Sequence, residues 1–185
     1  MSVEILQKVN LFSQLDCECL GKLANKMTMR SYPKNAVLIS EGDESDSLYI
    51  IISGKVKAFL RDENGKEVIL NFHSAGEYFG ELSLLDGEAR SASVMTMDAV
   101  KLAIIAKPDF DNLLDENPKL AQGLIRHLSL RLRALTENVR SLALMDVYGR
   151  VAKTLLELAE PEGEDKMVIR QKLTQQDIAN MVGAS

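Results

Sequence analysis

The interpretation of this chain rests on the stretch Phe79-Gly80-Glu81-Leu82-Ser83-Leu84-Leu85-Asp86-Gly87-Glu88-Ala89-Arg90-Ser91-Ala92. Because glycine has no side chain, the backbone at Gly80 can approach a ligand closely. The turn from Leu82 to Leu85 can point free N–H groups at an anion, and Arg90 supplies a permanent, fork-shaped cation. A carboxylate repels a phosphate, so the partner expected for Glu81 is a neutral donor such as a sugar hydroxyl. The stretch therefore predicts a site for a phosphorylated nucleotide with a free ribose hydroxyl, although an ordinary turn also fits so short a pattern.

Short strands are predicted on both sides of this stretch, because β-branched and aromatic residues are enriched there and alternate with polar ones. The predicted strands are 36–40, 48–52, 55–60, 67–72, 91–97 and 100–105. Turn-forming residues separate them, as Glu41-Gly42-Asp43 and Asp62-Glu63-Asn64-Gly65 illustrate. Strands of this length and spacing predict an antiparallel β-barrel or jelly roll.

Helices are predicted before and after the strands. Apolar residues recur at helical spacing in residues 3–9 and again in residues 16–27, where Asp16 can cap the start. After the strands, Pro108 precedes a short helix over residues 109–115, and Pro118 begins a long one.

The long helix carries apolar residues at alternating steps of three and four. They are Ile125, Leu128, Leu132, Leu135, Val139 and Leu142. This spacing is the a/d seam of a coiled coil. A helix packed on its own domain usually shows a wider apolar stripe, whereas the flanking positions here include Ser129, Arg131, Thr136 and Asn138. We therefore expect a parallel two-stranded dimer interface rather than an internal core helix.

A second domain is predicted to begin at residues 146–150, which interrupt the seam and are interpreted as a hinge. An amphipathic helix is expected over residues 147–160, followed by an exposed turn at 161–165 and a short strand at 166–170.

The last segment has the pattern of a helix that ends in a sharp turn. Thr174 and Asp177 have the spacing of a capping box, Gly183 can turn the chain between two helices, and Ser185 can cap the next one. The face expected to be buried consists of Ile178, Ala179 and Val182.

Composition narrows the class of protein. Hydrophobic residues make up 46% of the 185 residues, but no apolar run approaches the roughly 20 residues of a membrane-spanning helix. The start, Met1-Ser2-Val3-Glu4, lacks the basic and apolar regions of a signal peptide, so we expect a cytoplasmic protein that does not contact a membrane. The net charge of −5 argues against a chain that coats nucleic acid over its whole surface. The arginines between Arg126 and Arg150 form either a local basic patch or a solvated helix face.

No metal site is predicted. His73 and His127 are the two histidines, and neither has an acidic or thiol partner at metal-ligand spacing. His73 is expected at the solvent edge of a strand and His127 on a helix surface. Cys17 and Cys19 are the two cysteines, too few for the four thiolates of an iron–sulfur cluster.

Phe79-Gly80-Glu81-Leu82 together with Arg90-Ser91-Ala92 resembles the cyclic-nucleotide-binding family. With the heptad helix and the segment from Thr174 to Ser185, the chain resembles the cyclic-AMP receptor protein/FNR family of bacterial transcription regulators from Leu11 onward. The resemblance implies that the arginine and serine hold the cyclic phosphate and the glutamate holds the ribose 2′-hydroxyl. The implied ligand-binding segment is Gly80, Glu81, Leu82, Arg90, Ser91 and Ala92.

The resemblance implies an α+β fold in three parts. Residues 1–116 form a cyclic-nucleotide-binding β-barrel of the jelly-roll type, residues 117–145 a dimerisation helix, and residues 146–185 a partial winged helix-turn-helix domain that lacks its recognition helix. The function implied is that of a ligand-gated transcription regulator, not an enzyme, which forms a homodimer and has DNA and RNA polymerase as partners. The residues expected toward DNA are Thr174, Gln175, Gln176 and Ser185.

Cyclic AMP is the expected effector, with no other cofactor. In the resembled family two adjacent polar residues of the long helix meet the adenine, and the matching positions here are Leu135 and Thr136. Thr136 fits that role, but an aliphatic Leu135 cannot exchange a hydrogen bond with an exocyclic amine, so the preference for adenine is left open. The alternatives are the same fold with a cyclic dinucleotide or no ligand, and a cyclic-nucleotide-binding module without DNA binding. An enzyme would need a convergent set of His, Glu or Asp, which the sequence does not offer.

Overall fold

The computed structural model describes residues 6–13, 15–44, 46–163, 166–170 and 173–184. The chain divides into two compact units, one made of residues 1–59 and 71–128 and the other of residues 60–70 and 129–185. The three-part domain division expected from the sequence stays a prediction. Within the described ranges, no helix combines the length and the apolar character needed to cross a membrane.

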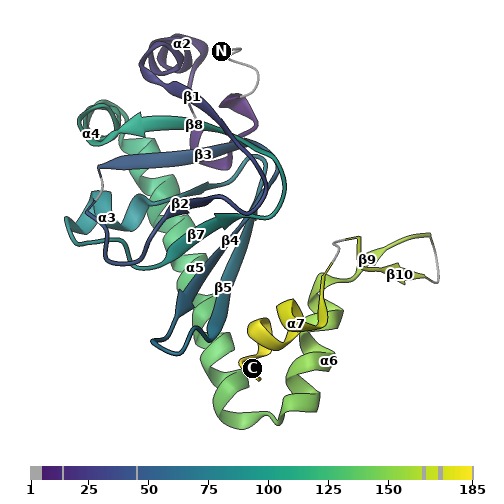
Figure 1. Cartoon of the computed structure of the whole chain (residues 1–185). Coiled ribbons are helices and arrows are strands. Elements are labelled where there is room, and N and C mark those ends of the chain that lie inside the picture. The colour runs from purple at the N-terminus through teal and green to yellow at the C-terminus, as the bar shows by residue number, and fades with distance from the viewer. Residues whose placement is uncertain (1–5, 14, 45, 164–165, 171–172, 185) are drawn as a thin grey trace. The chain divides into compact units, whose positions relative to one another are not determined.

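Two four-stranded sheets form the barrel, and their strands pair antiparallel, as β3 does with β8 and β4 with β7 (Figure 1). One sheet has the order β1-β8-β3-β6 and the other the order β2-β7-β4-β5. The strands are β1 Thr28–Tyr32, β2 Val37–Ile39, β3 Ser47–Ser53, β4 Lys55–Arg61, β5 Glu67–Ser74, β6 Tyr78–Phe79, β7 Ser93–Thr96 and β8 Val100–Ala106. The predicted α+β fold with an antiparallel barrel is confirmed.

Each of the six predicted strands is present, while β1 and β6 were not predicted. β1 is mostly exposed and therefore lacks a clear alternation of apolar and polar residues. β6 has two residues, which is too short for any periodicity.

The sheet that contains β3 has a hydrophobic cluster on each face, because alternate residues of a strand point to opposite faces. On β3, Leu48 and Ile50 pack into a cluster with helical residues, and Ile51 packs into a second cluster with residues of the other sheet. Most of the helical residues come from η1 Asn10–Phe12, α2 Cys17–Lys26, α4 Lys107–Glu116 and the first part of α5 Pro118–Leu144, and Leu84 comes from α3 Glu81–Asp86.

Two of the predicted helix starts around the barrel are confirmed, while the short helix predicted over residues 109–115 begins earlier, at Lys107, and the start of the helix predicted over residues 3–9 lies outside the described residues. The side chain of Asp16 accepts a hydrogen bond from the backbone N–H of Cys19 at 2.8 Å and so caps α2. Within the cluster on the helical side, Leu20 and Leu23 of α2 are buried. α5 begins at Pro118, as predicted.

One prediction about the barrel is wrong. His73 was expected at a solvent edge, and β5 does lie at the end of its sheet, but the His73 side chain is only 4% exposed. It is covered because its ring packs against Phe79, with ring centroids 6.3 Å apart.

The second unit contains the rest of α5 together with α6 Val147–Leu158, the pair β9 Glu160–Pro161 and β10 Met167–Val168, and α7 Gln175–Val182. Asp146 caps α6 by accepting from the N–H of Gly149 at 2.8 Å. The interruption expected over residues 146–150 is therefore narrower than predicted, since residues 147–150 are already helical. The predicted strand at 166–170 contains β10, and residues 164 and 165 of the predicted turn lie outside the described ranges.

The start of α7 confirms the predicted capping box. Thr174 N–H donates to Asp177 Oδ2 at 2.9 Å, and Asp177 N–H donates to Thr174 Oγ1 at 3.1 Å. Gly183 ends the helix in the left-handed conformation, with φ of +64°. The predicted cap Ser185 lies outside the described residues.

The buried face of α7 differs in part from the prediction. Val182 is buried, but Ile178 and Ala179 are only half-buried. Asn180 is buried instead, and its Oδ1 accepts from Gln176 Nε2 at 2.8 Å, which satisfies the amide oxygen.

Candidate functional site

The quoted stretch folds around the short helix α3, Glu81–Asp86, which lies between two glycines in the left-handed conformation. Gly80 has φ of +84° and Gly87 has φ of +76°. A Cβ atom at Gly80 would collide with the guanidinium of Arg90 and lie 3.2 Å from the carbonyl oxygen of Ser47, whereas nothing lies within 4 Å at Gly87. Both positions favour glycine for its backbone freedom, but Gly80 also makes room for a functional side chain.

Arg90 is a buried cation, with only 4% of the residue exposed. Its Nη1 donates to the carbonyl oxygen of Gly80 at 2.7 Å and to the hydroxyl oxygen of Ser83 at 2.9 Å, and its Nη2 donates to the carbonyl oxygen of Ser47 at 2.7 Å. Burial lowers the pKa of Arg90 from its ordinary value. Because an arginine starts from a pKa above about 12, it stays charged. The protein thus holds a fixed positive charge next to α3.

Two aromatic rings continue the site from Arg90. The guanidinium carbon lies 5.7 Å from the centre of the Tyr49 ring, and Tyr49 stacks on Phe79 with centroids 5.1 Å apart and planes inclined by 2°. A cation over an aromatic face is attracted to the ring quadrupole. Burial also raises the pKa of Tyr49, so its hydroxyl stays neutral.

Glu81 is a buried carboxylate in the first turn of α3, with 2% of the residue exposed. Its negative charge raises the pKa of Arg90, opposing the effect of burial. A carboxylate repels a phosphate but can accept a hydrogen bond from a neutral sugar hydroxyl. That role for Glu81 stays a prediction.

The structure brings the other residues of the quoted stretch to the rim of the same region. Leu82 is 43% exposed, Ser91 is exposed and Ala92 is half-buried. The backbone there is fixed, because Arg90 N–H donates to the Asp43 carbonyl at 3.0 Å and Gly42 N–H donates to the Arg90 carbonyl at 2.9 Å. The ligand-binding roles of these residues also stay predictions.

Three further contacts of the site were not predicted. Ser47 contributes a backbone carbonyl and Ser83 a hydroxyl to Arg90, and Lys107 donates from Nζ to the carbonyl oxygen of Leu84 near the end of α3. Ser83 stands inside the quoted stretch and could have been found there as a polar residue among leucines. A backbone carbonyl carries no signal in the sequence.

Leu135 and Thr136 lie on the part of α5 that belongs to the second unit. Leu135 is 48% exposed, and Thr136 Oγ1 donates to the carbonyl oxygen of Leu132 at 2.9 Å. Their participation in a site with Arg90 stays a prediction.

The predicted seam is largely an exposed apolar stripe. Leu128 is the exception, because it is half-buried against the cluster that joins the barrel and its helices. The other members are between 48% and 64% exposed and are Ile125, Leu132, Leu135, Val139 and Leu142. A large apolar stripe of this kind is typical of a surface that another polypeptide covers.

The residues expected toward DNA lie at the start of α7. Thr174, Gln175 and Gln176 are exposed, although Thr174 also serves in the capping box. The contacts of Arg150 were not predicted: its Nε donates to the Val182 carbonyl at 2.8 Å and its Nη1 donates to the Met145 carbonyl at 2.9 Å. One guanidinium therefore joins the end of α7 to the residue that follows α5.

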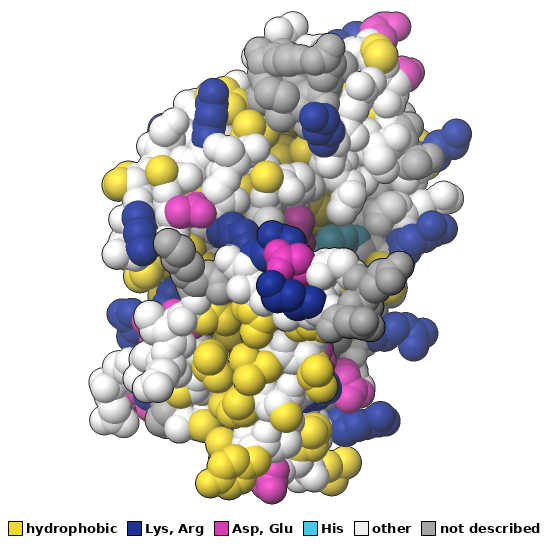
Figure 2. All heavy atoms as spheres, turned by 90° about the vertical axis from the view of Figure 1, so that its right-hand side faces the viewer, with side chains coloured by type: hydrophobic (Ala, Val, Ile, Leu, Met, Phe, Trp, Pro, Cys, Tyr) yellow, Lys and Arg dark blue, Asp and Glu magenta, His cyan; other side chains and the backbone are white. Residues whose placement is uncertain are grey.

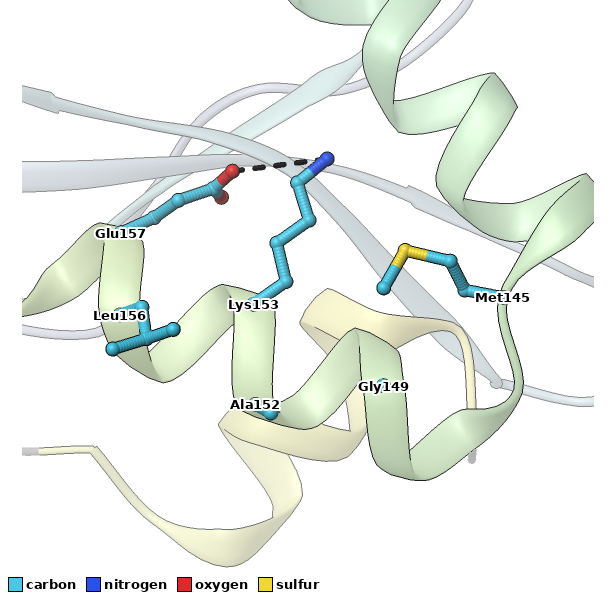
Figure 3. A pocket seen from close by; sticks show the side chains of 6 residues that line it. All are labelled: Met145, Gly149, Ala152, Lys153, Leu156 and Glu157. Atoms are coloured by element: carbon cyan, nitrogen blue, oxygen red, sulfur yellow. Dashed lines mark ion pairs between the residues drawn. The ribbon is translucent and has the colours of Figure 1, made fainter.

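Figure 3 shows a hollow on the second unit, beside α6. Lys153 and Glu157 extend toward one another there, 3.8 Å apart, and Lys153 also pairs with Glu137 at 3.0 Å. The lining residues are Met145, Gly149, Ala152, Lys153, Leu156 and Glu157. The lysine is already paired with two carboxylates, so we do not place a nucleotide phosphate here.

Figure 2 shows Lys and Arg, Asp and Glu, and His side chains gathered near the middle of one face of the molecule, with a broad area of apolar side chains elsewhere on it. Such a mixture of charges could suggest a metal site. Among the described residues, however, no three His, Cys, Asp or Glu side chains come together in a group that could hold a metal ion.

The sequence matches two protein-family models. Residues 29–117 match the cyclic nucleotide-binding domain, and residues 149–185 match the Crp-like helix-turn-helix domain. The first match contains the whole stretch from Phe79 to Ala92, and the second contains α7.

Curated relatives are similar over most of their length. The CRP-like cAMP-activated global transcriptional regulator of Mycobacterium tuberculosis is 34% identical over 185 residues, which cover 98% of this chain and 83% of the relative. The cAMP-activated global transcriptional regulator CRP of Salmonella typhimurium is 38% identical over 162 residues, which cover 85% of this chain and 76% of the relative.

Solved structures show the same fold. The c-di-GMP responsive global regulator CLP of Xanthomonas campestris has a TM-score of 0.80 at 26% identity, over 92% of this chain and 86% of that one. The catabolite activator protein of Thermus thermophilus has a TM-score of 0.66 at 30% identity, over 95% of this chain and 81% of that one.

Proposed function

The chain belongs to the cyclic-AMP receptor protein/FNR family of bacterial transcription regulators, and we propose that its effector is cyclic AMP, bound in the barrel. The observation that carries this proposal is the buried pair of Arg90 and Glu81 beside Gly80. One member is a fixed cation for a phosphate, and the other is a carboxylate for a hydroxyl. The cyclic phosphate and the ribose 2′-hydroxyl of a cyclic nucleotide supply that combination.

Binding would proceed as an exchange of partners at Arg90. Its guanidinium donates to the Gly80 and Ser47 carbonyls and to the Ser83 hydroxyl, which are neutral acceptors. A charged phosphate oxygen accepts a shorter and stronger hydrogen bond than a neutral oxygen does. The phosphate can therefore compete for the same N–H groups, and the exposed Ser91 hydroxyl next to Arg90 can add a further donor.

The response is proposed to pass through a homodimer to DNA. The apolar stripe of α5 pairs with its copy in a second chain, and Thr136 on the same helix senses the bound base. The Crp-like helix-turn-helix domain, with Gln175 and Gln176 exposed on α7, is proposed to contact DNA and to recruit RNA polymerase. Cyclic AMP can shift this equilibrium only by binding the DNA-competent state more tightly than the other state.

A cyclic dinucleotide is the second candidate effector. The regulator CLP, which has a TM-score of 0.80 to this chain, is described as c-di-GMP responsive. Leu135 also favours this alternative, since its side chain offers no hydrogen bond to an adenine amine. The Glu81 and Arg90 pair supports the cyclic mononucleotide, because each residue has one complementary group on that smaller ligand.

Calorimetric titration of the chain with cyclic AMP, cyclic GMP and cyclic di-GMP tests the proposal. We expect saturable binding of cyclic AMP. Arg90→Lys keeps a positive charge but loses the fork, and should weaken binding about 10- to 100-fold, because a hydrogen bond to a charged group contributes about 1.5 to 3 kcal/mol. Arg30→Lys, at an exposed position of β1, is the matched control and should bind normally. Binding of cyclic di-GMP alone, or equal affinity in both variants, would contradict the proposal.

A further inference from the structure

His73 is a buried polar residue to which the family's phosphate and ribose contacts give no role. It lies on β5 with 4% of the residue exposed, and no residue of the described part of the chain hydrogen-bonds to its Nδ1. A buried polar atom usually finds a partner, because leaving it unpaired is unfavourable. A histidine at such a position therefore calls for an explanation other than packing.

A continuous row of rings connects His73 with the proposed phosphate site. The His73 ring packs on Phe79 with centroids 6.3 Å apart, Phe79 stacks on Tyr49 at 5.1 Å, and the guanidinium of Arg90 lies over Tyr49. Phe79 directly precedes Gly80 in the sequence. His73 thus lies beside the segment that holds the phosphate and ribose groups, within the same unit of the fold.

The face of β5 that carries His73 is open next to the histidine. Asn71 stands two residues earlier and therefore points to the same face of the strand. Its side chain is exposed, and its Oδ1 accepts from the N–H of Phe72 at 2.8 Å. A ligand held by Arg90 and Glu81 can extend along this face.

One nitrogen of the His73 ring lies near a carboxylate. Nδ1 lies 3.9 Å from Glu77 Oε1, and Glu77 is held in place because its Oε2 accepts from the N–H of Ser74 at 2.7 Å. Because Glu77 stands on the Nδ1 side of the ring, Nε2 is the nitrogen on the side away from this carboxylate.

We propose that His73 determines base specificity: its Nε2 accepts a hydrogen bond from the exocyclic amino group of a purine nucleotide bound at the Arg90 and Glu81 site. This inference rests on the proposed function and deepens it. It supplies the acceptor that Leu135 cannot provide, so adenine recognition moves from the long helix to the barrel strand β5.

The test compares cyclic AMP with cyclic inosine monophosphate, which carries a carbonyl oxygen in place of the 6-amino group and a hydrogen on the adjacent N1. Calorimetric titrations of the wild-type chain should show a preference for cyclic AMP of about 10- to 100-fold, because one hydrogen bond is lost and two acceptors face each other in the analogue. In His73→Leu the preference should fall below about 3-fold, chiefly through weaker binding of cyclic AMP. His73→Gln, which restores an acceptor, should recover part of it.

His127→Leu is the matched control. It makes the same substitution at the other histidine, which lies on α5 with its ring 5.0 Å from Tyr78, and it should keep the wild-type preference. Thermal unfolding of each variant verifies that the barrel is folded. An unchanged preference in His73→Leu, an equal loss for both nucleotides, or a wild type that does not discriminate overturns this inference while the proposed function stands. A wild type that binds neither nucleotide overturns both.

Discussion

The two glycines that flank α3 allow a stringent test of how the site is built. Ala in the left-handed conformation costs ~1 to 2 kcal/mol of stability, and this strain applies to Gly80→Ala and Gly87→Ala alike, since both positions have positive φ. In Gly80→Ala the new methyl group also meets the Arg90 guanidinium, whereas in Gly87→Ala it meets open space. Displacing Arg90 breaks its hydrogen bond to the Gly80 carbonyl, and a hydrogen bond of a charged group contributes ~1.5 to 3 kcal/mol.

We therefore expect Gly87→Ala to lower the free energy of unfolding by ~1 to 2 kcal/mol and Gly80→Ala by ~2.5 to 5 kcal/mol. Urea titrations measure both free energies of unfolding. An unchanged dependence of the free energy on urea concentration indicates that each variant exposes the same surface on unfolding. Calorimetry with cyclic AMP gives the second readout, in which Gly80→Ala loses binding and Gly87→Ala keeps it. Equal destabilisation by the two substitutions, or normal binding by Gly80→Ala, would refute the view that Gly80 exists to admit Arg90.

Two further predictions concern the helices. Val139→Glu places a charge in the apolar stripe of α5 and should convert the proposed dimer to a monomer in sedimentation velocity. Leu130→Glu, at an exposed position outside the a/d register, should leave the protein dimeric. A dimeric Val139→Glu would exclude the stripe as the interface. The backbone N–H of Cys19 holds the pKa of the Asp16 carboxyl below its ordinary value. The cap therefore stabilises α2 fully at pH values above the pKa that Asp16 has in the unfolded chain, and this stabilisation is lost as the pH falls through the pKa of Asp16 in the folded protein. The destabilisation by Asp16→Ala should accordingly be present at neutral pH and disappear in acid unfolding titrations, and a pH-independent effect would contradict the cap.

The sequence allowed a correct prediction of the elements whose signals are local. The apolar alternation of β3 and the capping residues Asp16 and Thr174 act within a few positions of themselves, so their effect can be inferred without the fold. β1 pairs with β8, which is distant in the sequence, and most of its side chains are exposed. Residues 28–32 therefore show little alternation of apolar and polar residues from which the strand could be predicted.

In the candidate site, too, features with a local signal in the sequence could be predicted and features that depend on long-range contacts could not. Gly80, Glu81 and Arg90 could be proposed from their chemistry and spacing, and the structure places all three around the start of α3. The acceptors that hold Arg90 are mostly backbone carbonyls, and every residue type has one. The burial of His73 was missed because it depends on Phe79, which belongs to the opposite sheet.

The second unit suggests how a movement of the long helix would reach the DNA-binding helix. The side chain of Leu142, a member of the apolar stripe, lies close enough to Gly183 that a Cβ there would be 3.2 Å away. Arg150 adds a charged link, because it donates both to the Met145 carbonyl after α5 and to the Val182 carbonyl at the end of α7. Cations are stabilising at helix C-termini, where carbonyl groups lack hydrogen-bond partners. The Arg150 guanidinium supplies such partners at the C-terminal ends of both α5 and α7. These contacts join the end of α5 to the end of α7 within the second unit.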